Sequence, residues 1–155
     1  MLLYRISKTK YARDLSSDGA RKAGGRWNLK GIPVIYTSDS TALATLEALI
    51  HTPLNLVPKK MSITSFELPD NLEIDAIAQT KLPRNWAKYP APVELAEMGT
   101  KWAEKCGKVV LRVPSSVTPY GEGNNYILNP RHRDFQKIKI ISIIPYKFDT
   151  RLHKK

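Results

Sequence analysis

The chain has 155 residues, a length that fits one domain with a hydrophobic core of its own. Its hydrophobic content of 42% excludes a disordered chain, and the interruption of every apolar run by polar residues excludes a membrane span. The formal net charge of +11 favours an anionic partner, and the single cysteine, Cys106, excludes an internal disulfide.

The N-terminus and the distribution of charge predict the compartment of the protein and the character of its surface. No basic segment followed by an apolar stretch of signal-peptide length opens the chain, so we expect a cytoplasmic protein with no membrane contact. Basic residues are spread over both ends of the sequence and form no block, which is typical of a solvated surface. A nucleic-acid-binding domain usually pairs such charge with a reading helix or an aromatic-studded sheet, and neither is evident.

The first third of the sequence predicts two strands, a long loop and a helix. Residues 2–6 and 33–36 have the composition of strands, and the polar, Gly-rich stretch 7–31 between them predicts a loop with one helical turn. A loop of this length in a compact domain is usually functional. Asp39 or Ser40 can cap a helix that runs to about His51.

The spacing within this helix sets the position of Glu47. Leu43, Leu46 and Ile50 recur at helical spacing and predict one apolar stripe. Glu47 follows Leu43 by four residues and precedes Ile50 by three, so it lies at the margin of the stripe. We therefore expect a carboxylate held close to the core.

The rest of the chain continues the mixture of strands and helix, which indicates an α+β fold in a single domain over 1–150, followed by a basic tail at 151–155. After Tyr146 we expect a frayed end. The patterns predict strands at 61–68, 108–113 and 137–144, an extension of the sheet at 72–74, turns over 83–92, and a helix over 93–105 that ends near Gly107.

Separate elements supply the polar residues that suit a ligand site. The guanidinium of Arg26, preceded by two glycines, presents a planar fork of donors that fits a phosphate or pyrophosphate. Glu47 could stabilise the positive charge that develops on a ribose carbon when a glycosidic bond breaks. Tyr36, at a strand end, could stack on or hydrogen-bond to a ligand, and Ser115 follows a strand that Pro114 terminates.

Each residue also has a purely structural interpretation. Arg26 alone reads as a surface charge, Glu47 as a partly exposed helix carboxylate, Tyr36 as a half-buried strand end, and Ser115 as a turn residue. Trp27 and Cys106 are interpreted as packing residues. No pair of histidines stands at ligand spacing and only one cysteine is present, so we expect no metal site. Only the combination of these residues therefore indicates a site.

That combination resembles the RES-domain family, which takes its name from Arg, Glu and Ser. The family's Arg falls on Arg26, its Tyr on Tyr36, its Glu on Glu47 and its Ser on Ser115, while Arg5 matches a further basic position. The matching strings are GGRWN at 24–28, GIPVIYTS at 31–38, ATLEALIH at 44–51, VPSS at 113–116, and NPRH at 129–132, which is similar to an Asn-Pro-x-His segment of the family.

The resemblance implies a fold similar to that of ADP-ribosyltransferases, a mixed, split β-sheet with flanking helices around an NAD-binding cleft. It implies the toxin of a toxin–antitoxin pair that takes NAD as its substrate and needs no cofactor. Glu47, Arg26 and Ser115 would be catalytic, and Arg5, Arg26, Tyr36 and Ser115 would bind NAD. The implied partner is an antitoxin with a helix-turn-helix DNA-binding domain that occludes the cleft, so this chain would touch DNA only through the antitoxin.

Three functions stay open at this point. The first is an enzyme that breaks the nicotinamide–ribose bond of NAD by hydrolysis or phosphorolysis. The second is an ADP-ribosyltransferase that modifies a cellular protein. The third is a basic nucleic-acid-binding module without catalysis, whose binding would fall steeply with salt and would not depend on Glu47.

Overall fold

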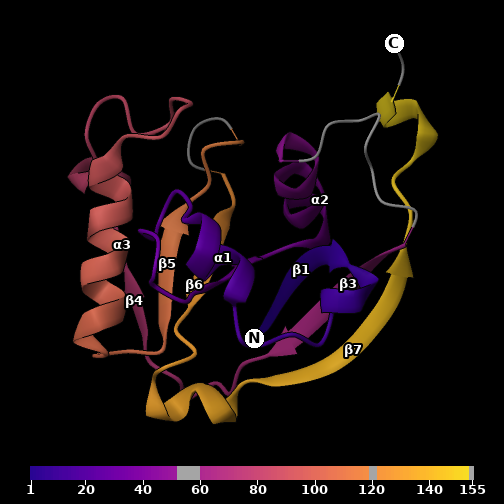
Figure 1. Ribbon diagram of the computed structural model, residues 1–155, viewed down its shortest axis with the longest axis horizontal. Helices are drawn as coiled ribbons and strands as arrows, with labels where there is room; N and C mark the ends of the chain where they lie inside the picture. Colours follow the sequence, from indigo (N-terminus) through magenta and orange to yellow (C-terminus); the bar gives the residue numbers. More distant parts are fainter. Residues whose placement is uncertain (52–59, 119–121, 154–155) are drawn as a thin grey trace.

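The computed structural model describes residues 1–51, 60–118 and 122–153. A seven-stranded mixed sheet in the order β4-β5-β6-β2-β1-β3-β7 forms its frame (Figure 1). Only β4 and β5 pair in parallel; every other neighbouring pair is antiparallel. The strands are β1 (Leu2–Lys8), β2 (Ile35–Ser38), β3 (Met61–Glu67), β4 (Ile74–Ala76), β5 (Val110–Pro114), β6 (Asn124–Leu128) and β7 (Lys139–Tyr146).

Helices flank this sheet and confirm the predicted α+β class. Figure 1 shows α3 beside β4 and β5, and α2 over the part of the sheet that holds β1. The α-helices are α1 (Asp18–Ala23), α2 (Thr41–Ile50) and α3 (Val93–Lys105), and the 3-10 helices include η1 (Thr9–Tyr11), η3 (Gln79–Lys81), η5 (Arg133–Lys137) and η6 (Thr150–His153). No helix in the described part of the chain is long and apolar enough to cross a membrane.

The sheet is nearly divided at its centre, where a single residue pair, Tyr4 with Ser38, joins β1 to β2. β2 otherwise pairs with β6 over its whole length. The core has two parts. One cluster includes Leu3, Phe66 and Leu128, and the other is rich in tryptophan, with Trp27, Trp86 and Trp102.

The predicted elements and the observed ones agree best where the sequence pattern is long. The helix expected at 93–105 matches α3, and the helix expected to begin at a Ser40 cap is α2, where Ser40 Oγ accepts from Leu43 N at 3.2 Å. The strand expected at 33–36 begins two residues later, as β2. β6 was not predicted, because Asn124 and Asn125 at its start are residues that strands usually avoid.

Three finer predictions are wrong. Leu46 and Ile50 are 40% and 56% exposed, so the buried side of α2 follows Leu43 and Ala44. Cys106, interpreted as a packing residue, is exposed, and it takes the left-handed conformation (φ 49°) at the end of α3. The chain after Tyr146 does not fray at once, because Phe148 is buried and its ring packs edge-on against Tyr146, with 5.0 Å between centroids.

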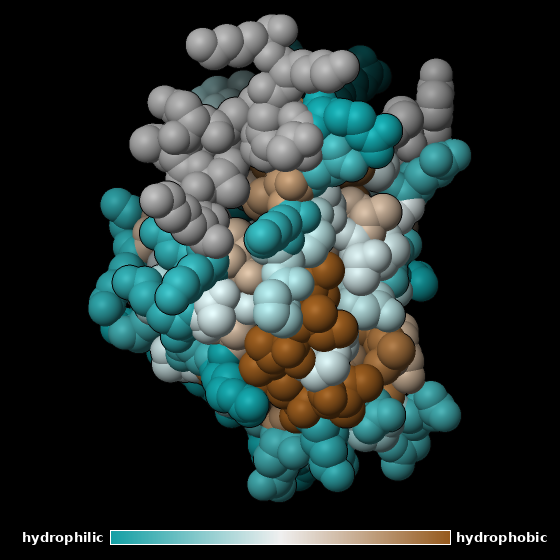
Figure 2. Space-filling view, turned by 90° about the vertical axis from the view of Figure 1, so that its right-hand side faces the viewer, coloured by the Kyte–Doolittle hydropathy of each residue, from teal (hydrophilic) through white to brown (hydrophobic). Residues whose placement is uncertain are grey.

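β7 forms one edge of the sheet and borders an apolar surface. Ile141 and Ile144 of this strand are 50% and 57% exposed. Figure 2 views the molecule from this side and shows hydrophobic side chains gathered into a patch. A β-bulge opposite Ser65, together with Pro145 and Lys139, makes the free edge a poor template for pairing with another chain.

Candidate active site

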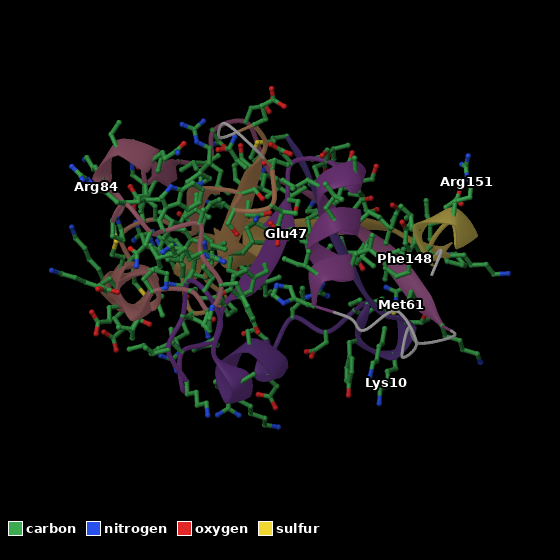
Figure 3. All side chains as sticks on the ribbon, turned by 90° about the horizontal axis from the view of Figure 1, so that it is seen from above. Lys10, Glu47, Met61, Arg84, Phe148 and Arg151 are labelled. Atoms are coloured by element: carbon green, nitrogen blue, oxygen red, sulfur yellow. The ribbon has the colours of Figure 1, made fainter. Side chains whose placement is uncertain are left out.

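Glu47 lies on the side of α2 that faces β5 and β6. Its side chain is half-buried and comes from the same helix face as the buried Leu43 and Ala44. Figure 3 shows Glu47 in the middle of the molecule, with Arg84 and Arg151 at opposite ends. The sequence prediction of a carboxylate held near the core agrees with this position.

Two donors fix one oxygen of this carboxylate. Ser115 Oγ donates to Glu47 Oε1 at 2.9 Å, and Asn125 Nδ2 donates to the same oxygen at 2.5 Å. Ser115 stands directly after β5 and is fully buried, and its Oγ also accepts from Val117 N at 3.1 Å. Among the described residues no donor lies within hydrogen-bond distance of Oε2, so this oxygen keeps its lone pairs for a ligand.

Asn125 is itself oriented by a neighbour. Ser38 Oγ donates to Asn125 Oδ1 at 2.8 Å, which fixes the amide so that its NH2 group points at Glu47. Ser38 and Asn125 are paired residues of β2 and β6. Neither residue is among the site residues predicted from the sequence, because the sequence pattern does not predict β6. A strand prediction over NNYIL would have placed Asn125 beside the ends of β2 and β5.

Tyr36 holds the loop that carries Arg26. Its hydroxyl donates to Asn28 Oδ1 at 2.7 Å and accepts from Trp27 N at 3.0 Å. Asn28 is buried, and its Nδ2 donates to the backbone oxygens of Ala20 and Ile32 at 2.9 and 3.0 Å. Both hydrogen bonds of the Tyr36 hydroxyl are therefore made within the protein. Burial raises the pKa of Tyr36 well above its ordinary value, so the phenol stays neutral.

Gly25 is required by this packing. A Cβ at residue 25 would lie 2.6 Å from the Tyr36 hydroxyl oxygen and 3.0 Å from Asn28 Oδ1. The glycine before Arg26 thus lets the loop approach Tyr36 closely. The group that Gly25 approaches closely is therefore a side chain of the protein itself.

Arg26 projects from this loop towards a second one. Its Nη1 donates to Trp86 O at 2.6 Å and its Nη2 to Lys88 O at 3.3 Å. Burial lowers the pKa of Arg26, while the nearby groups of Glu47 and Tyr36 act in the opposite direction. Glu47 and Arg26 therefore lie within electrostatic range of each other. The guanidinium keeps Nε–H and one hydrogen on each Nη for a ligand.

Arg5 is occupied elsewhere. From β1, its Nη1 donates to Asp14 O and its Nη2 to Tyr11 O and Ala12 O, each at 3.1 Å. The guanidinium also lies 5.4 Å from the centre of the Phe66 ring. Burial lowers its pKa, and Asp14 opposes this shift. In this structure Arg5 supports the segment after β1, and none of its hydrogen bonds goes to Arg26, Tyr36, Glu47 or Ser115.

The remaining candidates are easily placed. Within the described residues, no group of three or more His, Cys, Asp or Glu side chains could hold a metal ion. Trp27, interpreted as a packing residue, is 2% exposed and belongs to the tryptophan-rich part of the core. The site thus brings together Glu47, Ser115 and Asn125 in one hydrogen-bonded group, with Arg26 nearby and Tyr36 beneath its loop.

The chain is similar to several known proteins. It is 36% identical to "Toxin Res" of Photorhabdus laumondii over 99% of this chain and 98% of that protein, and 36% identical to "Toxin Res" of Yersinia enterocolitica over 98% and 99%. It is 34% identical to the "Prs ADP-ribosylating toxin" of a Sphingobium species over 96% of this chain and 92% of that protein.

A solved structure shares the fold. A chain of the M. tuberculosis MbcT-MbcA toxin-antitoxin complex superposes with a TM-score of 0.70 at 18% sequence identity, covering 94% of this chain and 84% of that one. The family description "RES domain" matches residues 2–149. On this match and on relatives that align along nearly their whole length, the chain belongs to the RES-domain family.

Proposed function

We propose that this protein is the enzymatic toxin of a toxin–antitoxin pair and that it cleaves the nicotinamide–ribose bond of NAD. The observation that carries the proposal is the fixed carboxylate of Glu47, with Oε1 held by Ser115 and Asn125 and Oε2 left to a ligand, in electrostatic range of Arg26. The names of its relatives, two of them "Toxin Res" and one an ADP-ribosylating toxin, support the same assignment.

In this proposal the two charged groups have different tasks. As the glycosidic bond breaks, its electron pair leaves with nicotinamide, and positive charge develops on the ribose carbon. Glu47 Oε2, by accepting from a ribose hydroxyl, places a negative charge beside that carbon. Arg26 uses its remaining N–H groups on the pyrophosphate, which positions the substrate.

Ser115 and Asn125 are positioning residues in this scheme. A carboxylate that accepts two hydrogen bonds on one oxygen cannot rotate freely, so its other oxygen is already oriented when substrate arrives. In this proposal the hydrogen bond from the Ser115 hydroxyl to Glu47 serves to orient the carboxylate. Tyr36 positions Arg26 through the loop.

The type of reaction depends on which molecule accepts the ADP-ribosyl group after the bond breaks. Water gives hydrolysis, phosphate gives phosphorolysis, and a protein side chain gives ADP-ribosyl transfer. The relative from Sphingobium, which carries the name "Prs ADP-ribosylating toxin", favours transfer as the second candidate function. All three acceptors use the same bond cleavage.

An antitoxin is the proposed partner. A chain of the MbcT-MbcA toxin-antitoxin complex has the same fold, and the net charge of +11 suits an acidic segment of a partner as well as it suits a pyrophosphate. We propose that this partner carries a helix-turn-helix DNA-binding domain and that the toxin makes no direct contact with DNA.

Mass spectrometry of NAD and its products tests the proposal. Purified protein is incubated with NAD in buffer, with added phosphate, and with cell lysate as a source of protein acceptors. We expect release of nicotinamide in at least one arm, and the other product identifies the acceptor. Intact NAD in all three arms, with a folded protein, would refute the enzymatic function, and steeply salt-dependent nucleic-acid binding would then favour the third function.

A further inference from the structure

The NPRH segment at 129–132 and the adjacent Arg133 lie outside the candidate active site. The segment follows β6 at the end opposite Asn125, beside the C-terminal end of α3. Because β5 and β6 are antiparallel, Ser115 and Asn124 lie at one end of this strand pair, and Val110 and Leu128 lie at the other. In Figure 1 the 3-10 helix η5 that follows the segment lies at the bottom, below β5 and α3.

Asn129 makes this segment rigid. It is fully buried, its Nδ2 donates to Ala103 O at 2.8 Å, and its Oδ1 accepts from Arg131 N at 3.0 Å. Its backbone N–H donates to Val109 O at 2.9 Å. One side chain thus ties the end of α3 to the turn that presents Arg131.

His132 is oriented in the same way. Its backbone N–H donates to Asn129 O at 3.1 Å, and its Nδ1 accepts from Asp134 N at 3.0 Å. Because Nδ1 is an acceptor, the proton of the neutral ring is on Nε2. His132 is only 9% exposed, and Nε2 has no hydrogen-bond partner among the described residues. The ring therefore keeps one unused donor.

A cavity of about 310 Å³ opens at this place, and Cys106, Gly107, Arg131, His132 and Arg133 line it. This volume is at the lower end of the range for small-molecule sites. Arg131 and Arg133 are exposed, and neither forms an ion pair with any described residue. The carboxylate of Asp134 interacts with His132 and Arg133, but it is paired with Lys137 at 2.8 Å.

We infer that this cavity binds the phosphate group of a small ligand, at a site separate from the candidate active site. Two guanidinium groups without carboxylate partners supply the charge, and His132 Nε2–H supplies a directed donor. The turn is fixed by Asn129 before any ligand arrives, so little ordering is needed on binding. The phosphate can come from inorganic phosphate or from a phosphate monoester. This inference does not rest on the proposed reaction.

Chemical-shift mapping of the ¹⁵N-labelled full chain tests the site. Inorganic phosphate and glycerol 3-phosphate are titrated separately against chloride at matched ionic strength. We expect saturable shifts of the amides of Gly107 and of residues 131–133, with either phosphate source and without chloride doing the same. Stronger binding of the monoester would identify a phosphorylated metabolite as the ligand class.

Two variant pairs localise the binding. Arg131→Gln/Arg133→Gln removes both cavity arginines and should weaken phosphate binding by about tenfold or more. Arg84→Gln/Arg112→Gln removes the same charge from exposed positions elsewhere and should leave the affinity unchanged. An equal loss in both pairs, shifts confined to residues near Arg26 and Glu47, or the absence of saturation would overturn the inference. NAD cleavage is measured on the same samples, so the two proposals fail or succeed separately.

Discussion

At the scale of single residues, the candidate site depends on which oxygen or nitrogen each side chain leaves free. Glu47 has one carboxylate oxygen occupied and one available, and Arg26 spends two of its five N–H donors on backbone carbonyls. Tyr36 and Ser115 use their hydroxyls within the protein. The sequence does not show which of these atoms are occupied and which are free, because the hydrogen bonds form between segments that are distant in the sequence.

The Glu47→Gln variant is expected to lose turnover and retain substrate affinity. Glutamine keeps the shape and can still accept from Ser115 and Asn125, but it removes the charge that offsets the developing cation. We expect the rate of NAD cleavage to fall roughly 100-fold or more, about 2.7 kcal/mol, with little change in NAD binding. Steady-state kinetics and calorimetry measure the two effects. The control is Glu97→Gln, an exposed carboxylate of α3, and near-normal turnover in folded Glu47→Gln would remove Glu47 from the mechanism.

The Tyr36→Phe variant is expected to lose stability, and the loss should depend on pH. Removing the hydroxyl leaves Trp27 N–H and Asn28 Oδ1 without this partner, at a cost of about 1 to 3 kcal/mol in the free energy of unfolding. The folded pKa of Tyr36 is raised by burial, so the unfolded chain ionises first as the pH rises. The free energy of unfolding of the wild type therefore exceeds that of Tyr36→Phe by the full amount below about pH 10, and this difference declines above that pH.

Urea denaturation at pH 7 and above pH 10 measures this difference. Tyr89→Phe is the matched control, because Tyr89 is 88% exposed. Equal stability of the wild type and Tyr36→Phe at pH 7 would contradict the hydrogen-bonding role of the hydroxyl.

At the scale of elements, the loop that carries Arg26 is held from two sides. Tyr36 of β2 supports it from below, and α3 packs directly against its backbone. A Cβ on Gly99 of α3 would lie 2.0 Å from Trp27 O and 2.8 Å from Trp27 C, so the helix and the loop are in contact without any intervening side chain. Leu29 N also donates to Thr100 Oγ1 at 2.9 Å.

The Gly99→Ala variant should therefore be destabilised, although alanine is the better helix former. The added methyl meets backbone that cannot move aside cheaply, and we expect a loss of about 1 to 3 kcal/mol, seen as a lower Tm. Gly19→Ala is the matched control in α1, because nothing lies within 4 Å of its Cβ. That variant should gain about 0.5 to 1 kcal/mol from helix propensity. A neutral Gly99→Ala would contradict the close approach of α3 to the loop.

The contact between Arg26 and the segment before α3 leads to a further prediction. Arg26→Ala removes the donors to Trp86 O and Lys88 O, so the amides of residues 84–89 should exchange with solvent faster. NAD binding should weaken by about 2 to 3 kcal/mol through loss of a charge-assisted contact. Hydrogen exchange and calorimetry measure the two effects.

Arg84→Ala serves as the control for this experiment, because Arg84 is exposed in the same segment and lies far from Glu47 in Figure 3. If folded Arg26→Ala binds NAD with unchanged affinity, Arg26 does not contact NAD and serves only to hold residues 86–88 in place.

At the scale of the whole molecule, the nearly divided sheet explains how the site is assembled. β1, β3 and β7 form one part, β4, β5, β6 and β2 form the other, and the helix α2 follows directly after β2 at the junction. Glu47 from α2 thereby meets Ser115 and Asn125 from β5 and β6. The formal net charge of +11 favours association of the whole molecule with anionic partners.

Expression in bacterial cells tests the proposed function of the whole protein. Without an antitoxin, the wild type should arrest growth and lower cellular NAD, because a free enzyme of this kind consumes a shared cofactor. Glu47→Gln should do neither. Co-expression of a helix-turn-helix partner encoded nearby should restore growth, and the two proteins should co-purify. Arrest with normal NAD and unmodified proteins would point to a different target.

The sequence by itself determined the family, the α+β class, the extent of α3 and the capped start of α2, because these depend on local strings and helical spacing. It also indicated Arg26, Tyr36, Glu47 and Ser115 as a set. Only the tertiary structure decided that Ser115 and Asn125 hold Glu47, that Tyr36 supports the Arg26 loop, and that Arg5 is bound to carbonyls of its own neighbourhood. The physical reason is that these hydrogen bonds depend on which strands pair, and β6, which carries Asn125, lacks a recognisable strand pattern at its start.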